Sequence, residues 1–268
     1  MKSMRVWTSN LTIATAVTSA LLLPLAIGKN VHAEILTVGA TYSLKAAFQE
    51  FLPMFEKEHG VTVRVVYGPS QKLRRQIEKG DSNIDVFLPE ATEELDILHK
   101  KGLTRSGEPR VYAQSSLVLV MSSEPQVTTT SFHYGLSNQP IRIAVADPKT
   151  SALGKSTTRM IKSLTSGYRN PLHLVHVQGP DEILNLVRMG KVDMGIVYRV
   201  DALTGGQIHI IDEATAGRGM PVNFSQAVVG SRGNESHRQA EEFFDFIMSP
   251  RIQKLLIHYG FEPMPVNQ

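Results

Sequence analysis

From residue 35 onward, short strand patterns alternate with helix patterns, and this alternation restricts the fold more than any other feature of the chain. The first β-branched run, Ile35 to Gly39, precedes apolar residues at helical spacing, namely Leu44, Phe48, Phe51, Leu52 and Phe55. Further strand and helix patterns follow each other at residues 61–67 and 73–79, 85–88 and 93–101, 141–146 and 155–164, and 172–178 and 181–189. Such alternation predicts an α/β fold in which mostly parallel sheets are flanked by helices.

The order of the patterns also predicts two lobes. A long strand pattern at 115–121 begins a second series, and three further patterns close the chain after this series ends, at 222–230, 235–248 and 250–258. Because these late patterns have no new sheet to build, we expect them to return to the first series. The predicted lobes are residues 34–115 with 226–268, and residues 116–225. Ligands of α/β sheets bind beyond the carboxyl ends of the strands, so the ligand cleft is expected between the lobes.

Residues 1–33 are predicted to form a cleavable secretory signal. They begin with Lys2 and Arg5, continue with an apolar stretch over residues 11–27, and end in the small-x-small sequence Val-His-Ala. An uncleaved membrane anchor is the alternative, although polar residues interrupt the apolar run that would have to span a bilayer. Together with Lys29, the two basic residues account for the whole formal charge of +3, so the mature chain from Glu34 onward is neutral.

The composition is that of a folded, exported protein. Hydrophobic residues make up 42% and charged residues 20% of the chain, which excludes a disordered chain and a polytopic membrane protein. The absence of cysteine excludes disulfides, thiolate metal sites and a lipidated N-terminal cysteine. Since the mature chain carries no net charge, it gives no reason to expect a nucleic-acid partner.

No catalytic motif stands out, and we expect a protein that is not an enzyme. Residues 152–157 resemble a phosphate-binding loop, but Lys149 stands where that loop requires its first glycine. His173 and His176 lie three residues apart on a predicted strand, so they point to opposite faces and are expected at the surface. The sequence therefore assigns no catalytic residue, no cofactor and no metal ligand.

Several predicted strands end in a turn in which a hydroxyl or a glycine opens a helix. These turns contain Ser43, Ser70, Ser151 to Gly154, and Gly179 with Pro180. Helix N-termini expose unpaired backbone N–H groups and a partial positive charge, so several such turns at one cleft can hold an anion without any arginine. Plain capping of the helix by serine is the alternative for each turn taken alone.

In these features the chain resembles the periplasmic molybdate-binding proteins of ABC transporters, which have the type II periplasmic binding protein fold. The resemblance covers about Glu34 to Phe261 and rests on the order and spacing of short motifs. These motifs are Val38 to Leu44, Gly68 to Ile77, Ile84 to Phe87, Ile143 to Pro148, Leu186 to Gly190, Met194 to Tyr198, Pro221 to Asn223 and Tyr259 to Phe261. The resemblance implies two α/β lobes with the ligand cleft between them.

The resemblance also implies a binding site. In that family a tetrahedral oxyanion is held by neutral hydrogen bonds from two serines, backbone N–H groups and one tyrosine. The matching positions of this chain are Ser43, Ser70, Leu153, Pro180 and Tyr198. No metal is implied apart from the oxyanion itself.

Some of these positions depart from the family pattern. Proline has no N–H to donate, so Pro180 lacks a hydrogen bond worth about 1.5–3 kcal/mol to a charged ligand unless Gly179 or Asp181 replaces it. Other departures are the bulk of Leu153, the sequence Pro89-Glu90 in place of small residues, and the nearby cations Lys155 and Arg199. These changes question the selectivity for molybdate and leave the fold prediction intact.

The function implied by the resemblance is that of a soluble, monomeric periplasmic protein that captures molybdate or tungstate and delivers it to an ABC permease in the inner membrane. Two alternatives stay open. One is a relative retuned to another small anion or a carboxylate, and the other is a periplasmic sensor or interaction protein that has lost transport.

Overall fold

The computed structural model describes residues 35–105, 107–123, 131–137, 141–165, 172–214, 221–229 and 234–262. The predicted signal peptide, residues 1–33, lies outside the described residues. Within the described part of the chain, no helix is both long enough and apolar enough to cross a membrane.

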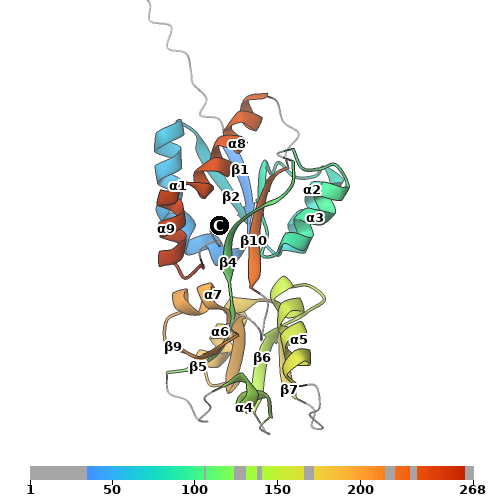
Figure 1. Ribbon diagram of the computed structural model, residues 1–268, viewed down its shortest axis with the longest axis vertical. Helices are drawn as coiled ribbons and strands as arrows, with labels where there is room; N and C mark the ends of the chain where they lie inside the picture. Colours follow the sequence, from blue (N-terminus) through green and yellow to red (C-terminus); the bar gives the residue numbers. More distant parts are fainter. Residues whose placement is uncertain are drawn as a thin grey trace, which may run out of the picture. The chain divides into compact units, whose positions relative to one another are not determined.

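The first sheet has five strands in the order β2-β1-β3-β10-β4 (Figure 1). The strands are β1 (Ile35–Ala40), β2 (Thr62–Tyr67), β3 (Val86–Leu88), β4 (Arg110–Ser115) and β10 (Val222–Val228). β1 pairs in parallel with β2 and β3, whereas β10 is antiparallel to β3 and β4. The prediction of a mostly parallel sheet is therefore confirmed, because the returning strand β10 runs against four strands that share one direction.

Helices cover both faces of this sheet, as Figure 1 shows. They are α1 (Lys45–His59), α2 (Ser70–Lys79), α3 (Thr92–Lys100), α8 (Asn234–Met248) and α9 (Pro250–His258), with a short 3-10 turn at Tyr42–Leu44 before α1. α1, α8 and α9 pack on one face around Phe48, Phe51, Phe55 and Phe243, and α2 and α3 pack on the other face around Leu73, Phe87, Leu95 and Leu98. The helix α1 continues through Pro53.

The second sheet repeats this arrangement, with the order β7-β6-β8-β5-β9. The strands are β5 (Leu117–Ser122), β6 (Arg142–Ala146), β7 (His173–Val177), β8 (Met194–Tyr198) and β9 (Ile208–Glu213). Its helices are α4 (Phe132–Ser137), α5 (Ala152–Leu164), α6 (Pro180–Arg188) and α7 (Arg199–Thr204). β6 is parallel to β7 and β8, and β5 is antiparallel to β8 and β9. Below, the first lobe means the first sheet with its helices, and the second lobe means the second sheet with its helices.

The chain passes between the sheets at two places. The strand predicted at 115–121 corresponds to β5, which begins at Leu117 in the second sheet, whereas β4, which ends at Ser115 in the first sheet, was not predicted. The chain returns between β9 and β10, and β10 already pairs with β4 at Val222, before the predicted boundary at residue 226. The lobe boundaries in residue numbers stay a prediction, while the α/β class with two helix-flanked sheets is confirmed.

Candidate functional site

The carboxyl ends of the central strands of the two sheets bring the predicted turns together. β1 and β3 are neighbours, and the turns that follow them are joined by a bond from the Thr41 N–H to the Leu88 carbonyl, 3.1 Å long. The turn after β2 is tied to β1 by the Gly68 N–H, which donates to the Ala40 carbonyl at 3.3 Å. The first lobe thereby places Ser43, Ser70 and the residues after β3 around one site.

Ser70 opens α2 and is buried at 5% exposure. Its hydroxyl oxygen accepts a hydrogen bond from the backbone N–H of Glu90 at 3.0 Å. The Ser70 hydroxyl hydrogen is therefore still available to a ligand, but the side chain also fixes the turn after β3.

Ser43 lies in the 3-10 turn before α1 and is buried at 6% exposure. Its hydroxyl has no hydrogen bond of normal geometry, although it lies beside the Asp201 carboxyl and lowers the pKa of that group. A buried hydroxyl without a hydrogen bond of normal geometry is uncommon in folded proteins, so Ser43 is a candidate to bind a ligand.

The second lobe contributes the N-terminus of α5, which begins directly after β6. Ser151 caps the helix by accepting a hydrogen bond from the Gly154 N–H at 3.4 Å. Gly154 lets the helix approach the strand end, because a Cβ at this position would lie 2.5 Å from the Ala146 carbonyl oxygen. Since the cap engages Gly154, the N–H groups of Ala152 and Leu153 stay outside the helical bonding pattern and face the other lobe.

These two N–H groups hold a side chain of the protein itself. The carboxyl group of Glu90 is buried and lies near the backbone N–H groups of Leu153 and Ala152, which favour its charged form. The Thr41 hydroxyl also donates to Glu90 Oε1 at 3.2 Å. Burial raises the pKa of Glu90 above its usual range, and the Thr41 hydroxyl and these two N–H groups oppose this shift only in part.

A second acidic side chain lies next to this group. Asp201 on α7 is 6% exposed, and burial raises the pKa of its carboxyl to about 8, with further contributions from the charges of Glu90 and Asp181. The two carboxyl groups therefore interact, one from each lobe. The predicted site of neutral hydrogen-bond donors contains two acidic groups as well.

Tyr198, the last residue of β8, is fully buried. Its ring packs edge-on against Phe224 of β10, with ring centroids 5.5 Å apart. The hydroxyl has no hydrogen bond of normal geometry, and burial together with the nearby charge of Glu90 raises its pKa well above the usual range. Tyr198 therefore keeps its proton and can donate it to a ligand.

Pro180 is the first residue of α6 and is buried. Because the helix has no side-chain cap at Gly179, its remaining free donors are the N–H groups of the residues after the proline. The carboxylate of Glu182 accepts a hydrogen bond from the Gln178 N–H at 3.0 Å. The start of α6 thus lies at the site without a donor at residue 180.

The two cations noted near the turns are engaged elsewhere. Lys155 lies 3.8 Å from Glu94, and Arg199 lies 3.6 Å from Glu213 and donates to the Gly260 carbonyl at 3.3 Å. Among the residues that the structure describes, neither of them forms an ion pair with Glu90 or Asp201.

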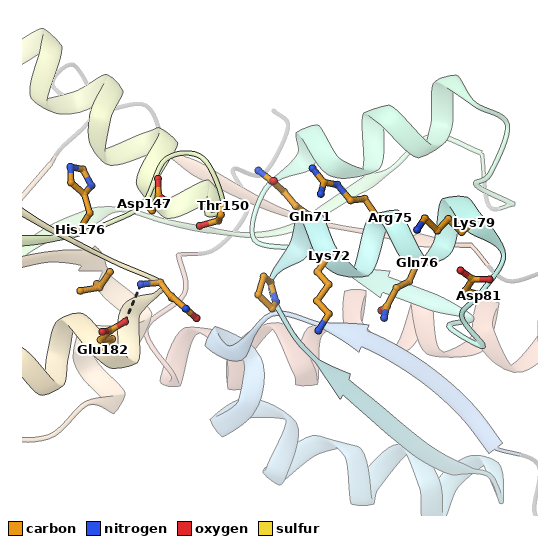
Figure 2. A pocket seen from close by; sticks show the side chains of 13 residues that line it. Gln71, Lys72, Arg75, Gln76, Lys79, Asp81, Asp147, Thr150, His176 and Glu182 are labelled. Atoms are coloured by element: carbon orange, nitrogen blue, oxygen red, sulfur yellow. Dashed lines mark hydrogen bonds between the residues drawn. The ribbon is translucent and has the colours of Figure 1, made fainter.

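Two cavities with shared lining residues open at the site. One, of about 570 Å³, is lined by Tyr42, Ser70, Glu90, Ser151 and Pro180, among others. The other, of about 950 Å³, lies between α2 and the ends of β6 and β7, and Figure 2 shows its side chains. Lys72, Arg75 and Lys79 lie on its α2 wall, and Asp147, His176 and Glu182 lie on the opposite wall.

His173 and His176 are both exposed on β7, as predicted from their spacing. Within the described ranges, no group of three or more histidine, aspartate or glutamate side chains is placed to hold a metal ion.

The fold and the site define a two-lobed solute-binding protein, and comparison with known families agrees. The chain belongs to the bacterial extracellular solute-binding protein family, which matches residues 36–262. Proteins of this class bind and release a solute without converting it, so the chain is not an enzyme, as the sequence predicted.

Individual relatives refine this assignment. YvgL of Bacillus subtilis, whose name describes an ABC transporter substrate-binding lipoprotein, is 26% identical over 227 residues, which cover 84% of this chain and 85% of YvgL. The molybdate-binding protein ModA of Escherichia coli is 25% identical over 231 residues, which cover 84% of this chain and 88% of ModA. The resemblance to molybdate-binding proteins is thereby confirmed.

Solved structures show the same fold. The periplasmic molybdate-binding protein of Azotobacter vinelandii has a TM-score of 0.71 at 18% identity and covers 86% of this chain and 100% of its own. The sulfate-binding protein SubI of Mycobacterium tuberculosis has the same TM-score at 17% identity and covers 87% of this chain and 88% of its own. Since two binders of different anions are equally similar, the fold alone does not select the anion.

The sequence found part of this site. Ser43, Ser70, Leu153, Pro180 and Tyr198 all lie at strand ends that face the other lobe, and their assignment as ligand residues stays a prediction. Glu90 was noted only as a departure, and Thr41 and Asp201 were missed. Asp201 comes three residues after Tyr198, and this closeness in the sequence is a signal that could have found it. The sequence patterns did not reveal the helix α7, whose first turn contains Asp201.

Proposed function

We propose that this protein captures a small tetrahedral oxyanion, with molybdate or tungstate first, and delivers it to an ABC permease. The observation that carries the proposal is the pair of buried hydroxyls without a hydrogen bond of normal geometry, Ser43 beside Asp201 and Tyr198 beside Ser156. They come from different lobes, and an oxyanion between the lobes would accept a hydrogen bond from each.

The backbone donors of α5 support the same chemistry. Because the N–H groups of Ala152 and Leu153 already interact with a carboxylate, they are oriented for an acceptor oxygen. An oxyanion presents the same kind of oxygen as a carboxylate. The proposed ligand residues are therefore Ser43, Ser70, Leu153 and Tyr198, with Pro180 at the wall of the site.

The place of action follows from the family and from the sequence. An extracellular solute-binding protein acts outside the cytoplasmic membrane. The signal-like residues 1–33 support export to the periplasm, where a monomer would exchange its ligand with a permease.

A thermal-shift screen tests the proposal. The purified protein is heated with molybdate, tungstate, sulfate, phosphate, chromate or small carboxylates. A ligand present at ~100 times its dissociation constant stabilises the folded state by about 2.7 kcal/mol, so a true ligand is readily seen. If none of the oxyanions raises the melting temperature, the proposal is wrong.

A larger organic anion is the second candidate, and the adjoining cavity of about 950 Å³ favours it. A tetrahedral oxyanion needs far less room. Lys72, Arg75 and Lys79 recur on one exposed face of α2 and would suit a second negative group of such a ligand. In the screen, stabilisation by a carboxylate and by no inorganic oxyanion would select this candidate.

A further inference from the structure

Glu90 occupies the position where the proposed ligand would bind. Its carboxyl group lies at the N-terminus of α5 on the Ala152 and Leu153 N–H groups, and it also takes the Thr41 hydroxyl. The backbone of Glu90 is held separately by Ser70, so the residue is fixed at the site even if its carboxyl group moves. The protein therefore carries a built-in group that competes with an oxyanion for the same donors.

An arriving oxyanion changes the surroundings of this carboxyl group. The ligand takes over the N–H groups that hold the negative charge on Glu90. A charged Glu90 would then lie buried beside another anion without its donors, which is strongly unfavourable. A proton on Glu90 removes this charge and turns the carboxyl group into a donor to a ligand oxygen.

We propose that Glu90 makes oxyanion binding proton-coupled, so that the bound state holds one proton between the Glu90 carboxyl group and a ligand oxygen. This inference rests on the proposed function and names the residue that sets its selectivity. The proton has two possible sources. An acceptor-only dianion such as molybdate or sulfate must take it from solvent, whereas hydrogenphosphate brings its own.

The charged groups around Glu90 support this behaviour. Titratable groups from every neighbouring element face this region, namely Lys72 on α2, Glu93 and Glu94 on α3, Lys155 on α5, Asp181 and Glu182 on α6, Tyr198 at the end of β8, and Asp201 on α7. Glu94 is paired with Arg74 at 2.6 Å and with Lys155 at 3.8 Å. Among the described residues no lysine or arginine forms an ion pair with Glu90 itself, so a proton is the available counter-charge.

Burial already favours the protonated form of Glu90 before the ligand arrives, since it raises the pKa of this group. Asp201 is the rival carrier of the proton, because burial also raises the pKa of this nearby carboxyl group. The two carboxyl groups differ in position. Glu90 lies on the α5 donors, whereas Asp201 lies beside the Ser43 hydroxyl.

Titration calorimetry of the purified protein tests the proposal. Molybdate and phosphate are titrated at several pH values over a range of about two units, from ~6.5 to ~8.5, in two buffers of different ionisation enthalpy. The difference between the binding enthalpies in the two buffers gives the number of protons taken up. Wild-type protein is compared with Glu90→Gln, Asp201→Asn and the exposed control Glu93→Gln. For one coupled proton, molybdate affinity falls about tenfold per pH unit above the pKa of the free site.

The expected result is uptake of about one proton with molybdate, and none with phosphate at pH 8.5, where it is hydrogenphosphate, in the wild type, in Glu93→Gln and in Asp201→Asn. Glu90→Gln should take up no proton and should bind molybdate at least ~10-fold more tightly than the wild type at pH 8.5.

Molybdate binding without proton uptake in the wild type would overturn the proposal and leave the proposed function standing, because Glu90 would then simply swing away. Proton uptake that survives in Glu90→Gln and disappears in Asp201→Asn would also overturn it. If neither wild type nor Glu90→Gln binds any oxyanion while thermal unfolding shows both to be folded, the proposed function fails as well.

Discussion

The two lobes have the same strand order but present different chemistry at their strand ends. In both sheets the fourth strand in this order, β10 or β5, is antiparallel to both of its neighbours, and the other four strands run in one direction. The first lobe presents side chains at the site, namely Ser43, Ser70 and Glu90. The second lobe presents backbone N–H groups at the start of α5, with Tyr198 and Asp201 behind them.

This difference shows how one topology can make a receptor with two unlike halves. The helix starts of the first lobe, at Ser43 and Ser70, are occupied by serines whose hydroxyls face the site. The corresponding starts in the second lobe contain the capped α5 and the proline-led α6. Each lobe therefore completes the other, and changes in either lobe should have separable effects.

The largest expected effect comes from the buried carboxyl group of the second lobe. The pKa of Asp201 in the folded state is about 8, against an ordinary value of 3.8. The folded protein thus holds a proton that the unfolded chain releases, so this stability is present below about pH 4 and is lost as the pH rises towards 8. The full shift corresponds to roughly 6 kcal/mol at 1.36 kcal/mol per pH unit.

We therefore expect Asp201→Asn to reduce this decline and to unfold at higher denaturant concentration than the wild type at pH 8. Urea unfolding at pH 5 and pH 8 measures the effect, with the exposed Asp96→Asn as the control. Equal pH dependence in wild type and Asp201→Asn would show that the Asp201 carboxyl group is not held neutral in the folded protein.

The two helix starts of the second lobe give the next contrast. In Gly154→Ala the new methyl group would meet the Ala146 carbonyl at 2.5 Å, so we expect a loss of about 3 kcal/mol in unfolding free energy and weaker ligand binding. Gly179→Ala meets nothing within 4 Å and should change stability by less than ~0.5 kcal/mol. Denaturant unfolding of both variants measures these changes in stability. Equal stabilities would mean that α5 does not depend on the close approach of Gly154 to the Ala146 carbonyl.

The hydroxyls of the two lobes should contribute equally to binding. Ser43→Ala and Tyr198→Phe each remove one hydrogen bond to a charged ligand, worth about 1.5–3 kcal/mol, so oxyanion affinity should fall ~10-fold to 100-fold with little loss of stability. Ser70→Ala tests the ligand contact less directly, because it also leaves the Glu90 N–H without its acceptor.

Matched controls exist in the first sheet. Ser115 and Tyr112 of β4 also carry buried hydroxyls without partners, but they are not among the positions that the family resemblance assigns to the ligand. Calorimetry should show unchanged affinity in Ser115→Ala and Tyr112→Phe. If the controls and the site variants weaken binding alike, the assignment of Ser43 and Tyr198 to the ligand is refuted.

The smallest expected effect concerns the proline at the start of α6. Pro180→Val restores one N–H at the first position of the helix, where no helical partner would use it. If residue 180 is the missing donor, molybdate affinity should rise about tenfold, or ~1.4 kcal/mol. Equal or weaker binding in the calorimeter would show that the site does not use a donor at this position.

The sequence alone predicted the elements and much of the site. Local spacing was sufficient for most helices and strands, because hydrophobic periodicity is a property of neighbouring residues. It missed β4 at 110–115, and only the partner strands reveal that the chain passes from one sheet to the other at Ser116. The short helix α7 was missed for a related reason, since six residues give too little periodicity to detect.

Sequence by itself determined the α/β class and the family, and it predicted the serine and tyrosine positions of the site. Only the tertiary structure decided that the backbone N–H of Leu153 faces the carboxyl group of Glu90. Glu90 and Leu153 are distant in the sequence, and neither residue indicates that the carboxyl group of one lies on the backbone N–H of the other. The same holds for the raised pKa of Asp201, because burial among groups from several elements, rather than any local sequence pattern, sets the cost of a charge.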